Sequence, residues 1–180
     1  NTAVGYEAGY ELVSGASNTL VGHDAGYGGT AASFSNVVAI GDEAGKSLTT
    51  ANDVVAIGRR AFNSINTQAS GVAVGFEAGR YAYGINNTYL GFKSGLGSNT
   101  ATNNTATNNV GVGFESLKAV TTGSSNIAIG STAGTAITTG SENIILGSDA
   151  GFDLKTGAGN IFIGHAAGNV YDGGSNSIGI

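Results

Sequence analysis

The sequence predicts an all-β fold: a parallel β-solenoid in which ten coils of about 17 residues stack on one another. Three observations predict it. A glycine returns at a nearly constant spacing, an aliphatic residue always stands directly before that glycine, and glycine is abundant while charged residues are scarce. One such coil is too small to bury its own apolar residues, so its stability must come from stacking against its neighbours.

The recurring glycine, called the anchor glycine below, defines the repeat. Six of the nine spacings between successive anchors are 17 residues, and the other three are 19, 16 and 22. The anchors are Gly5, Gly22, Gly41, Gly58, Gly75, Gly91, Gly113, Gly130, Gly147 and Gly164. The spacing of 22 arises because residues 99–103 are duplicated as residues 104–108. We therefore expect a single solenoid domain over residues 1–180, a fragment of a longer fibre, with a loop insertion at residues 97–108.

The residues before each anchor predict a β-strand. The first residue before the anchor is Val, Ile or Leu in every coil, and the third is Thr, Val or Ile, as at Ile40 and Val38. This period of two, with β-branched side chains, is typical of a strand that buries one face. We predict a strand of roughly four or five residues in each coil, with this β-branched face buried.

Two further positions recur in the coil. An aliphatic residue commonly stands seven residues after the anchor, as at Leu48 and Val120, and it predicts a second short strand before a polar turn. An asparagine often opens the next coil, as at Asn126 and Asn143. Stacked one coil above another, such side chains are expected to form an amide hydrogen-bond ladder.

The composition excludes several classes of protein. Frequent Val and Ile argue against a disordered linker, although 32 of the 180 residues are glycine. The formal net charge is −5 and Lys and Arg form no cluster, so nucleic acid is not an expected partner. No apolar run approaches the length of about 20 residues that spans a bilayer, so we expect no membrane insertion of this segment. The absence of cysteine excludes disulfides and thiolate metal sites.

Residues suited to catalysis do not converge in the sequence. The two histidines, His23 and His165, occupy equivalent turn positions eight coils apart, so they cannot share a site within one chain. The only adjacent acidic pair, Asp42 and Glu43, stands at an ordinary turn position. Neither a Gly-x-Ser-x-Gly elbow nor a calcium-binding glycine-aspartate nonapeptide is present. We expect no enzyme activity, no cofactor and no metal site.

The two residues after each anchor vary from coil to coil, and variable residues on a constant scaffold are typical of a binding surface. Three phenylalanines fall in one column there and are predicted to stack beside the Asn-Thr loop. Our hypothesis is that this aromatic stripe and the loop contact a receptor. The candidate binding residues are Phe76, Phe92, Phe114, Asn99, Thr100, Asn103, Asn104 and Thr105. The alternative is that the rings only pack on each other and cover the edge of the coil.

The segments at residues 126–134 and 55–61 resemble the head repeats of trimeric autotransporter adhesins, whose signature is an aliphatic-Ala-Ile-Gly-x-x-Ala core. The fuller unit, Asn-Thr-Ala-Val-Gly-Tyr-x-Ala at residues 1–8 followed by a Thr-Thr-Gly turn as in later coils, is similar to repeats of phage tail-fibre proteins and large bacterial surface proteins. The resemblance implies a left-handed parallel β-roll in which three chains pack side by side around a common axis.

The residues themselves support association. On the strand face opposite the β-branched one stand residues such as Ala39, Ala56 and Ile145, with no charged residue in any coil. A solvated face would carry polar side chains, so both faces of the strand are expected to be covered. We therefore expect a parallel homotrimer.

These observations together predict a structural and adhesive shaft or head segment of a trimeric fibre. We expect it to be extracellular, on a bacterial cell surface or a phage virion, and to attach to a cell-surface glycan or a protein receptor. Two alternatives remain. An ice-binding solenoid would align Thr121-Thr122 and Thr138-Thr139 on a flat face, although Tyr83 interrupts that column. The second alternative is a structural filament subunit without receptor binding, which would require only that the coils stack on one another.

Overall fold

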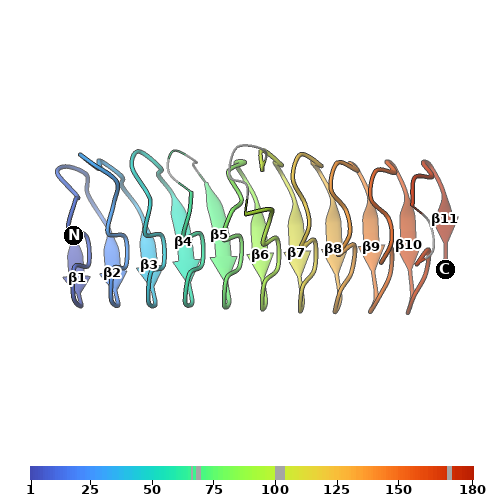
Figure 1. The fold of residues 1–180 in the computed structure, drawn as a ribbon, viewed down its shortest axis with the longest axis horizontal. Coiled ribbons are helices and arrows are strands. Elements are labelled where there is room, and N and C mark those ends of the chain that lie inside the picture. Colours follow the sequence, from blue (N-terminus) through green and yellow to red (C-terminus); the bar gives the residue numbers. More distant parts are fainter. Residues whose placement is uncertain (66, 68–69, 100–103, 170–171) are drawn as a thin grey trace.

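The computed structural model describes residues 1–65, 67, 70–99, 104–169 and 172–180. It confirms an all-β parallel solenoid of about ten turns, and no helix occurs in the described part of the chain. One strand from each turn lies beside the next in chain order, so that eleven short strands form a single parallel sheet along the long axis (Figure 1). The strands are β1 (Thr2–Val4), β2 (Thr19–Val21), β3 (Val38–Ile40), β4 (Val54–Ile57), β5 (Gly71–Val74), β6 (Thr88–Leu90), β7 (Val110–Val112), β8 (Ile127–Ile129), β9 (Ile144–Leu146), β10 (Ile161–Ile163) and β11 (Ile178–Gly179).

The register of the sheet follows the repeat in the sequence. Val4 pairs with Val21, and Val21 pairs with Ile40, so the residues before successive anchors lie in one column. The register also survives the 22-residue spacing, because Leu90 of β6 pairs with Val112 of β7. The longer spacing therefore leaves the pairing of β6 with β7 in register.

The prediction of which strand face is buried was wrong. From β2 to β10, the residue two before the anchor is buried inside the solenoid, as at Ala39, Ala56 and Ile145, whereas Ala3 of the first coil is exposed. The aliphatic and threonine residues on either side of it face outward, and Leu90 and Ile129 are 46% and 44% exposed. Alanine is the most frequent residue at the inward positions, which fits an interior that the opposite wall of the coil already fills with larger side chains such as Leu48. The strands span two to four residues, shorter than predicted.

The second predicted strand is also absent from the described residues, where only an isolated bridge joins Leu12 to Ala32. Most of its aliphatic residues are nevertheless buried, including Leu48 and Val120, whereas Leu12 is partly buried. The backbone conformation before these aliphatic residues explains why no second strand forms there. In the third coil Glu43 and Gly45 adopt left-handed φ angles of 56° and 59°, and such alternation is incompatible with an extended strand.

The anchor glycines stack with a backbone conformation that only glycine tolerates. Their φ angles lie between 122° and 142°, outside the regions open to other residues. From Gly5 to Gly147, a β-carbon would also come within 3.0 Å of a backbone atom of the next anchor. Two independent constraints therefore keep glycine at this position in the first nine coils, and the φ angle alone does so at Gly164.

The predicted asparagine ladder is confirmed and lies in the buried interior. Asn126 donates from Nδ2 to Asn109 Oδ1 at 3.0 Å and to the carbonyl of Gly140 at 2.9 Å. Its own Oδ1 accepts from the backbone N–H of Asn143 at 3.1 Å and from Asn143 Nδ2 at 2.9 Å. Every polar atom of the amide is thus paired, so burying the side chain leaves no polar group without a hydrogen bond.

The interior also adapts to its largest residue. The Tyr89 ring is fully buried, and its neighbour in the next strand is Gly111, where a β-carbon would come within 3.1 Å of the ring. Burial raises the pKa of the Tyr89 hydroxyl, and none of the described residues gives that hydroxyl oxygen a hydrogen bond. The tyrosine is therefore neutral and acts as a space-filling residue.

Candidate functional site

The residues directly after the anchors form a continuous column along one edge of the rod, called the edge column here. It begins with stacked rings of Tyr6 and His23, whose centroids are 5.4 Å apart. His23 Nδ1 then lies 3.2 Å from Asp42 Oδ1, and Arg59 donates to Asp42 Oδ2 at 3.0 Å. The guanidinium of Arg59 in turn lies 5.7 Å from the centroid of the Phe76 ring.

The three phenylalanines continue this column and stack as predicted. The ring centroids of Phe76 and Phe92 are 5.2 Å apart, as are those of Phe92 and Phe114, and the rings are nearly parallel. Phe76 is half-buried, whereas Phe92 and Phe114 are 39% and 49% exposed. The rings thus cover one another and still present apolar area to solvent; their part in receptor binding stays a prediction.

The loop residues predicted with them do not all face solvent. Asn99 and Thr105 are exposed, whereas Thr100 and Asn103 lie outside the described residues. Asn104 is buried, contrary to its assignment to an exposed loop: its Oδ1 accepts from the backbone N–H of Ser98 at 3.1 Å, and its Nδ2 donates to the carbonyl of Ser98 at 2.6 Å. Coil-to-coil bonding resumes there, because Tyr83 N–H donates to the carbonyl of Asn104 at 2.8 Å.

A ladder of charged residues runs beside the edge column. Arg60 donates from Nε to Glu43 at 2.6 Å, and Lys46 Nζ lies 3.0 Å from Glu43 and 2.8 Å from Asp24. The hydrogen bonds from Arg60 and Lys46 lower the pKa of Glu43 to about 2. A carboxylate held in its ionised form by two cations is poorly suited to carry protons.

The histidines and the acidic residues do not assemble a metal site. The Nδ1 atom of His23 lies 3.8 Å from Asp24, farther than from Asp42, and Asp24 is bound by Lys46 instead. Within the described ranges, no group of three His, Cys, Asp or Glu residues is placed to hold a metal ion. Nor does that part of the chain contain a helix with the length and hydropathy needed to cross a bilayer.

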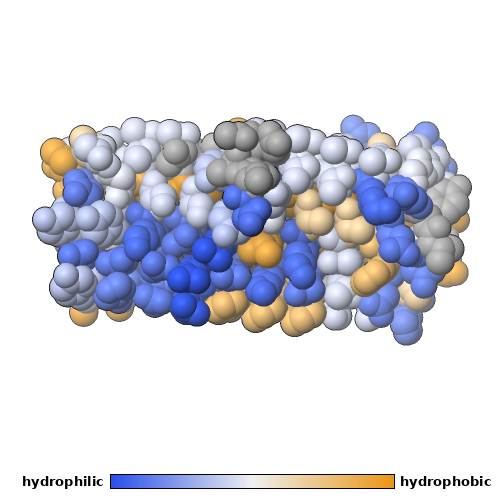
Figure 2. Space-filling model, viewed as in Figure 1, coloured by the Kyte–Doolittle hydropathy of each residue, from blue (hydrophilic) through white to orange (hydrophobic). Residues whose placement is uncertain are grey.

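The outward face of the sheet, called the outer strand face here, is a long and largely apolar surface. It consists of the first and third residues before each anchor position, and none of these residues is buried. Its members are Thr2, Val4, Thr19, Val21, Val38, Ile40, Val55, Ile57, Val72, Val74, Thr88, Leu90, Val110, Val112, Ile127, Ile129, Ile144, Leu146, Ile161, Ile163, Ile178 and Ile180. The surface seen in Figure 2 is by contrast largely polar. An uncharged apolar face that runs over all eleven strands far exceeds the scattered apolar residues of an ordinary soluble surface.

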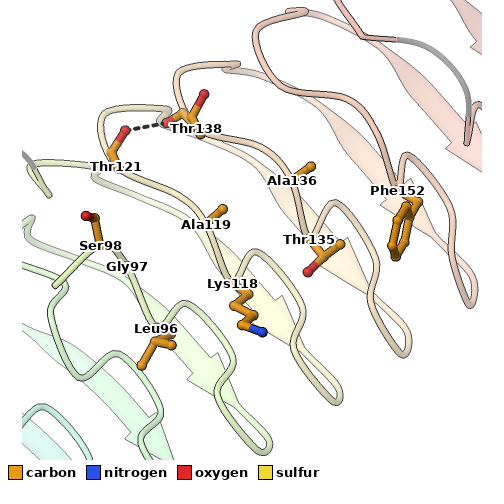
Figure 3. Close-up of a pocket in the computed structure, with 10 residues that line it drawn as sticks. All are labelled: Leu96, Gly97, Ser98, Lys118, Ala119, Thr121, Thr135, Ala136, Thr138 and Phe152. Carbon is orange, nitrogen blue, oxygen red and sulfur yellow. Dashed lines mark hydrogen bonds between the residues drawn. The ribbon is translucent and has the colours of Figure 1, made fainter.

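Sequence reasoning missed a groove of about 600 Å³ on the sixth to ninth coils (Figure 3). Its floor consists of small residues, Gly97, Ala119 and Ala136, at one position of three successive coils. Leu96 and Phe152 stand at its two ends, and the base of the inserted loop borders it through Ser98. The run of Gly and Ala at that position, beside the tandem duplication at residues 99–108, was the available signal.

The threonines of the proposed ice-binding face border the same groove. Thr121 Oγ1 donates to the carbonyl of Thr138 at 3.0 Å, and Thr138 Oγ1 donates to the carbonyl of Lys155 at 3.2 Å. These hydroxyl protons are thus committed to bonds between coils, which leaves the oxygen lone pairs as acceptors.

The comparisons with known proteins give no assignment: no protein-family model, no curated protein and no solved structure matches the chain.

Proposed function

We propose that this chain is a structural and adhesive segment of a fibre in which three copies lie parallel, with their outer strand faces toward a common axis. The single observation that carries the proposal is the apolar outer strand face. Residues such as Leu90, Ile129 and Ile163 are each more than 40% exposed in the single chain, and they repeat at every strand spacing along the rod. Covering them removes a hydrophobic cost of about 25 cal/mol for each Å² buried.

A second copy of the same chain is the partner that this face fits. The face carries no charge over its whole length, so an ionic or strongly polar surface would lose solvation against it without compensation. It is also straight and periodic, with one pair of outward residues per strand. A parallel copy offers ridges with the same period, so its side chains can interdigitate along the entire rod.

The adhesive part of the proposal concerns the surface away from the outer strand face. The half-exposed rings of Phe92 and Phe114, together with Asn99 and Thr105, lie outside the outer strand face and would remain accessible in such a fibre. We assign them to contact with a receptor on a cell surface, and we place the fibre on a bacterial surface or a phage virion, with coils that wind left-handed. No catalytic role is part of this function.

Light scattering tests the assembly. We expect the isolated 180-residue chain to have about three times the monomer mass of 17.7 kDa. A double variant, Ile129→Lys and Ile144→Lys, should fall to the monomer mass, because two buried charges per chain at the axis cost several kcal/mol each. Thr122→Lys, an exposed change on another part of the coil, is the matched control and should leave the mass unchanged. A monomeric parent chain contradicts the assembly, and so does a double variant that keeps the mass of the parent.

A further inference from the structure

We propose that the groove over the sixth to ninth coils binds a neutral glycan, with a sugar ring stacked on Phe152. The inference rests on the proposed adhesive function and names the chemistry of its ligand. The groove holds about 600 Å³, enough for several sugar units, and a second hollow of about 290 Å³ adjoins it on the other side of Phe152. The ring of Phe152 is 41% exposed and lines both hollows.

The shape of the groove suits an extended ligand with flat apolar faces. Ala119 and Ala136 present only methyl groups to the floor, between a wall that carries Thr121 and Thr138 and a wall that ends at Phe152 (Figure 3). The C–H face of a pyranose ring packs against an aromatic ring, and small residues on the floor allow the neighbouring units to lie close to the backbone. The exposed ring of Phe152 is in the position that such stacking requires.

The charges around the groove favour an uncharged ligand. Lys118 is the only cation that lines it, and its Nζ is 3.0 Å from Glu115 Oε1. In the adjoining hollow, Asp149 accepts hydrogen bonds from Thr132 Oγ1 at 2.5 Å and from Ser148 Oγ at 3.1 Å, which lower the pKa of its carboxyl. An ionised Asp149 repels the carboxylate or sulfate of an acidic glycan, while it accepts hydrogen bonds from sugar hydroxyls.

The hydrogen-bonding groups of the wall distinguish a glycan from a peptide. The backbone N–H groups of Ala119, Thr121 and Thr138 already donate to the next coil, so these three groups are not available to pair with a peptide strand. The hydroxyl oxygens of Thr121 and Thr138 still accept, because only their protons are committed. Thr135 also lines the groove and adds a further hydroxyl group. A ligand rich in hydroxyl groups matches this pattern.

Two further polar groups extend the site beyond Phe152. His165 and Asn169 line the smaller hollow together with Asp149. An imidazole, an amide and a carboxylate around one exposed ring supply donors and acceptors for the hydroxyls of a stacked sugar. The two hollows together therefore form one elongated site that crosses five coils, the sixth to the tenth.

The test uses the whole 180-residue chain, fluorescently labelled, on an array of neutral and acidic glycans. We expect neutral glycans to be retained. Phe152→Ser removes the stacking ring and Ala136→Leu fills the floor, and each should weaken retention about tenfold or more. The matched controls are Tyr10→Ser and Ser47→Leu, which make comparable changes at the same positions of the first and third coils, outside the groove. They should retain the parent affinity.

Three outcomes overturn the glycan site: no neutral glycan is retained, acidic glycans are preferred, or Ala136→Leu binds as well as the parent. Circular dichroism identifies any variant that fails to fold, and Ala136→Leu provides a second reading should Phe152→Ser be unstable. Light scattering on the same samples separates this inference from the fibre proposal. A trimeric mass without glycan retention removes the glycan site alone, whereas a monomeric mass removes the assembly.

Discussion

Replacing Gly130 by alanine is expected to lower the free energy of unfolding by at least about 3 kcal/mol. The φ angle of Gly130 is 142°, where a side chain strains the backbone, and an added β-carbon would overlap the carbonyl group of Gly147 in the next coil. The overlap is with backbone, so relief requires the two coils to separate. That separation would break hydrogen bonds between strands β8 and β9 as well.

Unfolding in urea, followed by circular dichroism, measures this loss. Gly173→Ala is the matched control, because its φ is not in the left-handed region and an added β-carbon would meet only Thr156 Oγ1, at 3.5 Å. We expect the control to stay within about 0.5 kcal/mol of the parent. Equal stabilities for the two variants would show that the anchor glycines do not hold the stacking distance.

The second large effect is expected from Asn126→Leu, in the middle of the buried ladder. The substitution removes four hydrogen bonds and leaves the carbonyl of Gly140 and the backbone N–H of Asn143 without a partner in the interior. A buried polar group left unpaired costs about 1–3 kcal/mol, so we expect a loss of at least about 3 kcal/mol in total.

The same urea titration measures the free energy of unfolding of Asn126→Leu. Asn99→Leu, at an exposed asparagine of the loop, is the control and is expected to change the stability by less than about 0.5 kcal/mol. In the third and fourth coils, apolar residues replace the asparagine of the ladder. Val37 and Val54 occupy the ladder position there and are buried among apolar neighbours. A stability of Asn126→Leu equal to that of the parent would mean that the ladder contributes packing alone.

The fold could be predicted because the repeat places identical chemistry at one position of every coil. A glycine column and an asparagine column are periodic in the sequence, so the stacking of Gly130 on Gly147 and the bonds of Asn126 followed from the spacing. The stacking of Phe92 on Phe114 was predictable for the same reason. Properties that depend on one column alone are visible in the sequence.

Properties that depend on several columns could not be predicted from the sequence. A period of two identifies two strand faces but does not say which one faces the interior, and the usual rule that larger apolar residues lie inside placed Ile129 on the wrong side. The prediction of a second strand was wrong because the backbone direction there depends on residues with left-handed φ angles, such as Glu43. The hydrophobic pattern does not encode that conformation. The groove arises from three neighbouring columns and the loop base near Ser98, so only the structure shows it.

The measurement that tests the central claim most directly is cross-linking through a single cysteine at Ile129, on the outer strand face. The chain contains no cysteine of its own, so any disulfide reports the introduced residue alone. If parallel copies cover this face in register, Ile129 of one copy lies beside Ile129 of another, and mild oxidation of dilute Ile129→Cys protein gives disulfide-linked dimers on a non-reducing gel. Thr122→Cys should remain monomeric on the same gel. Monomers from both variants would contradict a fibre in which copies of this chain meet through their strands.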